Sequence, residues 1–192
     1  MDQAGYDAIA AEELAAIMEA GQALIAEYSG PASTEAGANG GTVHTVIAGT
    51  GGDEMELLQF LPNEVQIAAG DTVRWENLSP NAEPHTVTFL GGEAPPEFVL
   101  VEGGEAGPPT FVQNPLVSNP TEATTFSGTG YINSGILASD LPTTTYELTF
   151  DTPGTYSYYC QFHGGPELPE GATPTPGAEI PLGGMVGTVV VT

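Results

Sequence analysis

The pattern of apolar and polar positions divides the chain into an N-terminal helical segment and a longer part built from short strand-like runs. Between residues 3 and 28, apolar side chains recur at steps of three and four, the period of an amphipathic α-helix. They are Tyr6, Ile9, Leu14, Ile17, Met18, Leu24, Ile25 and Tyr28. We expect this helix to pack as a strut on the main domain; a spacer that docks a partner or stands near a membrane is the alternative.

The segment after this helix changes character. Residues 29–41, SGPASTEAGANGG, are rich in glycine, serine and alanine and predict a flexible linker. The main domain is then expected to cover residues 42–192.

Within that domain the apolar positions alternate or form β-branched runs, and turn-forming residues separate most of them. The runs are TVHTVIA, EMELLQF, EVQIA, DTVRWEN, HTVTF, TTYELTF, GTYSYYC and MVGTVVVT. Several short strands without a helical period between them predict an all-β sandwich or barrel. Residues 91–143 are rich in glycine, proline, asparagine and threonine, and predict a strand or two joined by long surface loops.

Composition agrees with this fold class. The 26 glycines and 17 prolines favour turn-rich β structure over a helical bundle. With 192 residues the chain can bury a core without disulfides, and its single cysteine allows no internal one.

No apolar run approaches the roughly 20 residues that span a bilayer, so we expect no transmembrane segment. The first residues also lack the basic start and apolar core of a signal peptide.

The charge of the chain restricts its partners. Twenty-five acidic residues and a single arginine, Arg74, give a formal net charge of -24. Nucleic-acid phosphates bind through lysine and arginine, so nucleic-acid recognition is not expected. The negative field could steer a cationic partner, and adaptation to a salty or acidic habitat explains the same bias equally well.

Four residues form a candidate metal site. Cys160 and His163, separated by two residues, are expected on the loop where the strand GTYSYYC ends, His85 begins HTVTF, and Met185 begins the last run. Each has an ordinary explanation when taken singly, as a buried apolar residue or a loop histidine. Together they supply one thiol, two imidazoles and one thioether at the ends of three predicted strands.

These donors indicate copper more than zinc. In a structural zinc site, four nitrogen or sulfur ligands from the protein fill all the coordination positions, and they often come from paired Cys-x-x-Cys motifs. The chain has no such motif. Two imidazoles, one thiolate and a weak thioether match the trigonal copper site with a long axial methionine.

The segments around these donors carry a family resemblance. PHTVTF, FDTPGTYSYYCQFHGGP and GGMVGTVVVT resemble the copper-ligand segments of plastocyanin-like small blue copper proteins, the cupredoxins, and FLPNEVQIAAGDTVRWEN resembles their early strands. The likeness covers residues 42–192. It implies a Greek-key β-sandwich with one type 1 copper, held by His85, Cys160 and His163 in the equatorial plane and by Met185 on the axis.

The chain departs from this family pattern in two ways. Residues 164–184 separate His163 from Met185, whereas plastocyanins keep these ligands on one short loop, so a long insertion in the ligand loop is expected. Thr86 follows the first histidine, where family members often place an asparagine that helps to fix the ligand loop.

Other chemistry-bearing residues receive simpler interpretations. Gln161 is a reserve axial donor, and His44 is expected on the surface of an early strand. We expect Arg74 to pair with a local charge. Trp75, Tyr156 and Tyr158 are expected in the core or on a sheet.

The resemblance implies a single-electron carrier whose copper cycles between Cu(I) and Cu(II). The alternative is a copper-binding or delivery protein without electron transfer. An enzyme is not expected, because multicopper oxidases and copper nitrite reductases need further histidine clusters and the chain has three histidines. The edge of His163 or His85, framed by Phe162, Leu182 and Val186, would be the electron port.

The same resemblance implies redox partner proteins, cationic ones being favoured by the acidic surface. It also implies an extracytoplasmic location, in the periplasm or at the cell surface. We expect a monomer, and a membrane anchor, if there is one, would lie outside this chain.

Overall fold

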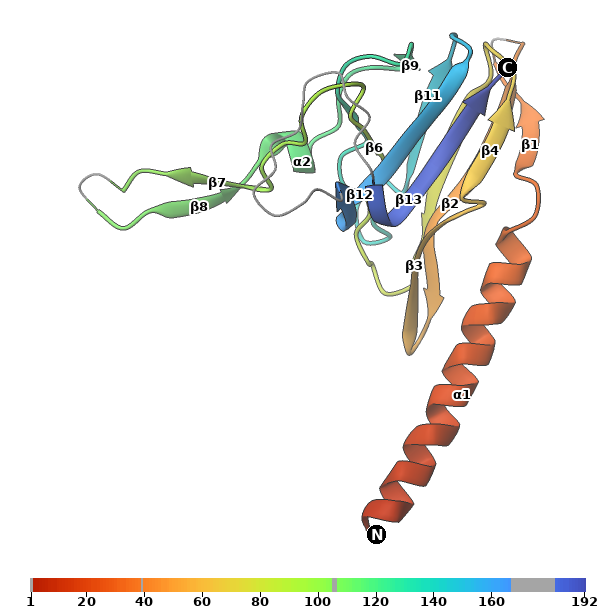
Figure 1. Cartoon of the computed structure of the whole chain (residues 1–192), viewed down its shortest axis with the longest axis vertical. Helices are drawn as coiled ribbons and strands as arrows, with labels where there is room; N and C mark the ends of the chain where they lie inside the picture. Colours follow the sequence, from red (N-terminus) through yellow and green to blue (C-terminus); the bar gives the residue numbers. More distant parts are fainter. Residues whose placement is uncertain (1, 39, 105–106, 167–181) are drawn as a thin grey trace.

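The structure, a computed structural model of the chain, describes residues 2–38, 40–104, 107–166 and 182–192. Two β-sheets face each other, a helix extends from one end, and a two-stranded arm projects from one side (Figure 1). The all-β sandwich with an N-terminal helix, predicted from the strand-like runs, is confirmed.

The first sheet contains strands from both halves of the chain, in the order β1-β2-β5-β11-β9, with β3 paired to β2. Its strands are β1 (Ser33–Ala36), β2 (Thr42–Gly52), β3 (Met55–Leu61), β5 (Thr72–Leu78), β9 (Thr125–Phe126) and β11 (Thr145–Phe150). In β5 the side chains of Val73, Trp75 and Asn77 point inward and alternate with more exposed residues. This period of two is what the sequence pattern predicted for a half-buried strand.

The second sheet has the order β10-β6-β12-β13-β4 and presents the metal-site segments. Its strands are β4 (Glu64–Ile67), β6 (Thr88–Phe89), β10 (Ile132–Asn133), β12 (Gly154–Pro166) and β13 (Leu182–Val191). β12 and β13 are antiparallel neighbours, whereas β4 lies parallel to β13.

An aromatic cluster fills the space between the sheets. Trp75 lies 5.3 Å from Tyr158 and 6.0 Å from Phe89, measured between ring centroids, and all three are fully buried. Truncating a buried aromatic of this size typically destabilises a protein by about 3–5 kcal/mol. The expectation that Trp75 and Tyr158 are core residues is confirmed, and Tyr156 is half-buried against Phe150 and Phe126.

Helix α1 (Gln3–Tyr28) has the predicted bounds, and it packs against β2 and β3 through its C-terminal half. Asp2 caps it by accepting a hydrogen bond from the Gly5 N–H. Gly21 is its one buried residue, close to the Met55 side chain on the β2–β3 hairpin, while Tyr6, Leu14 and Met18 are exposed. The nine alanines of the segment explain a helix that forms by intrinsic propensity with little burial. The expected strut therefore forms in the C-terminal half of the helix, where Ile17, Leu24, Ile25 and Tyr28 are half-buried on one face, whereas the apolar side chains of the N-terminal half are exposed.

The predicted linker also differs from the structure. Residues 33–36 form β1, which pairs with β2 in antiparallel register, Glu35 opposite Val43. Arg74 on β5 binds Glu35 and, through Nε at 2.7 Å, Glu147 on β11, as its expected local charge partners. The only arginine therefore holds together three strands of one sheet, which a composition-based prediction of a linker could not detect.

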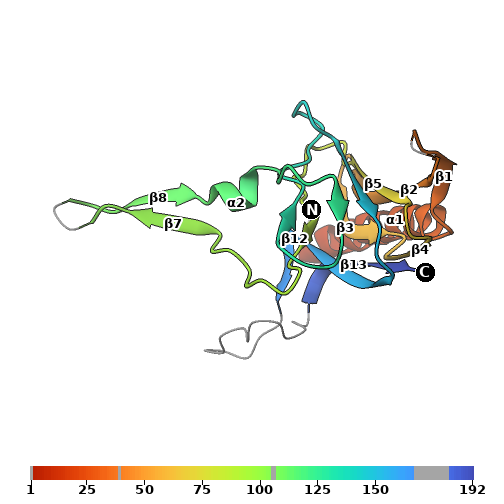
Figure 2. The same cartoon turned by 90° about the horizontal axis from the view of Figure 1, so that it is seen from above.

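The region of residues 91–143 contains more regular structure than predicted. Among the described residues, strands β7 (Val99–Glu102) and β8 (Thr110–Gln113) pair only with each other and form the projecting arm, and the short helix α2 (Pro115–Ser118) follows β8. Figure 2 shows from above that the arm extends away from both sheets. Among the described residues, no helix has the length and hydropathy that crossing a membrane requires.

Candidate metal centre

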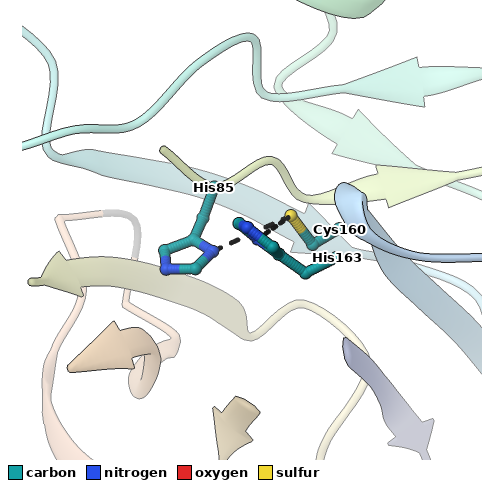
Figure 3. A group of neighbouring side chains, drawn as sticks. All are labelled: His85, Cys160 and His163. Carbon is teal, nitrogen blue, oxygen red and sulfur yellow. Dashed lines mark hydrogen bonds between the residues drawn. The ribbon is translucent and has the colours of Figure 1, made fainter. Parts of the chain in front are cut away.

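His85, Cys160 and His163 converge at one end of the sandwich (Figure 3). The Cys160 Sγ lies 3.8 Å from His85 Nδ1 and 3.6 Å from His163 Nδ1. One ligand atom from each of the three residues lies within 4.8 Å of the others. His85 and Cys160 are fully buried, and His163 retains partial exposure.

An irregularity in the β12–β13 ladder positions Cys160 and His163. Tyr159 pairs with Val186 and Gly164 with Gly184, so the four residues 160–163 of β12 lie opposite Met185 alone. Such a bulge bends the strand and changes the direction of its side chains. The expectation that Cys160 and His163 stand on a loop where the strand ends needs correction, because β12 continues to Pro166.

His85 reaches the site from the segment just before β6. Its backbone exchanges two hydrogen bonds with Leu137, at 3.0 and 2.8 Å, which fixes the backbone position of His85. The imidazole lies against Gly49 of β2, where an added Cβ would overlap His85 Nε2. Gly49 also has a φ of 85° at a register shift of β2, so glycine satisfies both the backbone conformation and the space.

The donor set fits a copper ion. Nitrogen and sulfur ligands bind ions of this size at about 2.1 and 2.3 Å, and in a trigonal arrangement this places nitrogen and sulfur about 3.8 Å apart. The two observed distances from Cys160 Sγ to histidine nitrogens, 3.8 and 3.6 Å, match that separation. The three side chains are therefore already arranged as a set of two nitrogen donors and one sulfur donor.

Burial shifts the pKa values of both His85 and Cys160. Desolvation, helped by the neighbouring His163, lowers the pKa of His85 from 6.5 to about 4, so its imidazole is neutral near pH 7. Burial raises the pKa of the Cys160 thiol, although the Thr86 N–H approaches Sγ at 3.4 Å and opposes this. A metal must displace the thiol proton, and binding therefore weakens as pH falls.

Glu83 is a site residue that the sequence analysis missed. Its Oε1 lies 2.9 Å from His163 Nε2, on the side of the ring away from Cys160. A carboxylate there accepts the Nε2–H hydrogen bond and leaves the Nδ1 lone pair directed at the sulfur. In the sequence, Glu83 is two residues from His85. The fold places its carboxylate against the other histidine of the site, His163.

Thr86 fixes the ligand segment through a chain of buried hydrogen bonds. The Gln161 N–H donates to Thr86 Oγ1 at 2.9 Å, and Thr86 and Thr88 hydroxyls lie 3.2 Å apart. The Thr88 hydroxyl donates to Asn133 Oδ1 at 2.9 Å. Thr86 stands where family members often have asparagine. Its hydroxyl still makes a hydrogen bond to the segment between Cys160 and His163.

Gln161 and His44 make side-chain hydrogen bonds to residues outside the donor set. The Gln161 side-chain nitrogen donates to the Tyr131 hydroxyl and to Asn133 Oδ1, so the amide is held by residues of the second sheet and its surroundings. His44 on β2 has its Nε2 3.1 Å from Oδ2 of Asp71, the residue just before β5, and this half-buried pair lies outside the site.

Met185 stands in the strand that faces the ligand segment. It is 1% exposed and belongs to the same buried cluster as Cys160. Backbone contacts here are close, because an added Cβ on Gly164 would lie 2.6 Å from the Met185 oxygen. Of the expected insertion, residues 164–166 and 182–184 pair as the ends of β12 and β13, and residues 167–181 lie outside the described residues.

Comparison with known proteins agrees with this donor chemistry. The model of the family described as copper binding proteins, plastocyanin/azurin family, matches residues 46–168. That region includes His85, Cys160 and His163 and ends before Met185.

Plastocyanins are among the similar curated proteins. A plastocyanin from Scenedesmus fuscus is 30% identical over 115 residues, covering 59% of this chain and 84% of that protein. The chloroplastic plastocyanin of Fritillaria agrestis is 29% identical over 146 residues, 76% of this chain. The chain spans 65% of the Fritillaria protein, just under two thirds. Among solved structures, a reduced mutant of amicyanin aligns over 78% of this chain and 82% of its own, at 19% identity and a TM-score of 0.39.

The lowered pKa of His85 predicts acid sensitivity of the copper-free protein. Between pH 6.5 and about 4 the unfolded chain binds a proton at this residue that the folded chain does not. The free energy of unfolding should therefore fall as pH decreases through this window, by up to about 3 kcal/mol. Urea unfolding of the copper-free protein at several pH values measures this decrease in the free energy of unfolding. His85→Gln should flatten the curve in that window, and an unchanged slope in the variant would contradict the assignment.

Removing the Glu83 carboxylate should weaken metal binding without unfolding the protein. Partners of ligand histidines typically contribute about 10- to 100-fold to metal affinity. We expect Glu83→Ala to lower Cu(II) affinity by about ten-fold or more in a chelator competition assay, and Glu83→Gln, which retains an acceptor oxygen, to lower it less. Glu64→Ala on the exposed side of β4 is the matched control. Equal affinities for Glu83→Ala and the control would contradict a role at the site.

Proposed function

Because the chain belongs to the plastocyanin/azurin family of copper-binding proteins, we propose that it is a single-electron carrier with one type 1 copper. Copper is its cofactor. We assign His85, Cys160 and His163 as equatorial ligands and Met185 as the axial ligand. When bound, copper supplies a one-electron couple between Cu(I) and Cu(II).

The observation that supports this proposal is the arrangement of two imidazole nitrogens and one sulfur in a buried and hydrogen-bonded setting. His85 is held by Leu137 and Gly49, His163 by Glu83, and the segment between Cys160 and His163 by Thr86. Side chains fixed in this way move little when the charge at the site changes. A carrier needs such a constant geometry, because each movement would add to the barrier for electron transfer.

The assignment of Met185 follows from its position in the ladder. It is the single residue of β13 opposite the four residues 160–163, and its side chain is buried with Cys160 in the core. A thioether is a weak donor, so a long axial bond agrees with its chemistry.

The exposure of the two histidines separates their roles. His85 is fully buried, so an electron port at its edge does not fit. His163 is partly exposed, and the ring of half-buried Phe162 lies 6.3 Å from its ring. We therefore place the port at His163, and we propose that the insertion at residues 164–184 influences partner choice there.

Burial also favours electron transfer over copper delivery. A delivery protein exchanges its metal and needs ligands that a second protein can reach, whereas Cys160 and His85 have no exposed surface. A role in catalysis is not proposed, because the chain contains only the histidines His44, His85 and His163.

We further propose that the protein works outside the cytoplasm as a monomer and exchanges electrons with partner proteins. The charge of -24 favours cationic partners through electrostatic steering, which should weaken with salt. The domain division proposed is residues 1–28, 29–41 and 42–192, with β1 as a structured part of the middle segment.

Copper loading provides the direct test. The oxidised protein should show the strong visible absorption and small copper hyperfine splitting of the family that it resembles, and Cys160→Ser should lose both while still folding. Absorption and electron paramagnetic resonance spectra measure this. A colourless Cu(II) form, or a variant with full colour, would rule out the thiolate site.

The axial assignment has its own test. Met185→Leu keeps the volume of the side chain and removes the sulfur, so the colour should remain and the reduction potential should rise, because the axial ligand tunes the potential. Protein-film voltammetry measures the potential. Val189→Ile, on the same buried face of β13, is the control for packing. If both variants keep the wild-type potential, Met185 is a core residue and not a ligand.

A further inference from the structure

Asn133 on β10 is a fully buried polar residue whose side-chain amide can stand in one orientation only. Its Nδ2 lies 3.0 Å from the Leu116 and Val117 oxygens and 3.1 Å from the Asn119 oxygen. A carbonyl oxygen only accepts hydrogen bonds, so the donating nitrogen, and not Oδ1, must face these three groups. The Oδ1 atom is therefore directed to β6 and β12, where it acts as an acceptor.

The carbonyl groups that fix this amide are themselves held in place. The Asn114 side chain, at the start of α2, accepts from the Leu116 N–H at 3.0 Å and donates to the Glu97 oxygen at 2.7 Å. The Leu116 oxygen also accepts from the Tyr131 hydroxyl at 2.7 Å, so both of its lone pairs are used. The orientation of Asn133 is therefore set by α2 and not by the metal site.

This orientation decides the direction of every hydrogen bond between Asn133 and the ligand segment. The Thr88 hydroxyl donates to Asn133 Oδ1 at 2.9 Å, so its oxygen can only accept from Thr86, whose hydroxyl lies 3.2 Å away. The Thr86 oxygen in turn accepts the Gln161 N–H at 2.9 Å. Thr86, Thr88 and Asn133 are fully buried, so solvent does not compete for these bonds.

Thr86 touches the ligand segment at two adjacent points. Its backbone N–H approaches Cys160 Sγ at 3.4 Å, and its hydroxyl holds the next residue, Gln161. The Gln161 side chain is held in addition by Asn133 Oδ1 at 3.3 Å. The place of the sulfur donor thus depends on where Thr86 stands, and Thr86 is held by the hydrogen bonds that begin at Asn133.

We propose that Asn133 is a positioning residue of the metal site, which acts on Cys160 through the hydroxyls of Thr88 and Thr86. A hydroxyl that donates to Thr88 presents its lone pairs to the Gln161 N–H, whereas a Thr86 hydroxyl without that acceptor is free to rotate away. The effect on a bound copper ion rests on the proposed function. The order of the hydrogen bonds does not, and it can be measured without the metal.

The test uses Thr88→Val, which keeps the shape of the side chain, removes its hydroxyl and leaves the bonds of Asn133 to α2. In the copper-free protein, the Gln161 amide should exchange its hydrogen roughly five-fold faster, compared with the amides of β2 in the same NMR sample. With Cu(II) added, the affinity in chelator competition should fall by about five- to ten-fold. The copper hyperfine splitting should increase, because a displaced thiolate shares less electron density with the ion. A residue that only stabilises the fold would leave this splitting unchanged.

Thr88→Ser keeps the hydroxyl and should restore the wild-type exchange rate, affinity and splitting. Thr72→Val is the matched control, because it removes a hydroxyl pair, Thr72 and Thr149 at 2.8 Å, from the other sheet. It should leave all three quantities unchanged. Wild-type values in Thr88→Val, or equal changes in Thr88→Ser or Thr72→Val, would overturn the role of Asn133. A wild-type protein without blue colour would instead refute the proposed function, and the exchange rates of Gln161 in the copper-free proteins would still decide on the hydrogen-bond order.

Discussion

The broken register between β12 and β13 is the constraint on which the site depends. Between the pairs Tyr159–Val186 and Gly164–Gly184, one strand has four residues and the other has one. An uninterrupted ladder would send Cys160 and His163 to opposite faces, since side chains alternate along a strand. The extra residues allow both to turn toward His85 while the strands remain paired on each side. Met185 is brought to the same place because it is the residue that spans the gap.

A bulge of this size needs other bonds, because its own backbone groups have left the ladder. The Thr86 hydroxyl takes the Gln161 N–H, and the chain through Thr88 and Asn133 continues to the carbonyls of α2. Each hydroxyl can donate in one direction and accept in the other, so the whole chain can be satisfied at once. The ligand segment is therefore supported by residues that are distant in sequence and have no ligand role of their own.

The sequence predicted the strands, the helix bounds and the three residues that converge at the site, because alternation and donor chemistry are local properties. It could not predict Glu83 or Gly49, whose roles arise from contacts with His163 and His85 across separate segments. Gly49 did leave a signal, a glycine inside the strand run TVHTVIAGTGG, which often marks a bulge or a close approach. β1 was missed because its composition is that of a linker and its order comes from pairing with β2 and from Arg74. The exposure of the N-terminal half of α1 could not be predicted either, since an alanine-rich helix forms with or without a partner.

The acidic residues act on two different length scales. Charges spread over the surface are screened beyond a Debye length of about 8–10 Å at physiological salt, so they act on the approach of partners more than on the metal. Glu83 is different, because its carboxylate touches the ring of His163 in a partly buried setting where screening is weak. A negative charge that close to the ring would stabilise a bound metal ion, and would stabilise its higher oxidation state more than its lower one. The net charge of -24 and the single carboxylate at the site can therefore be varied separately, the first to change partner encounter and the second to change the reduction potential.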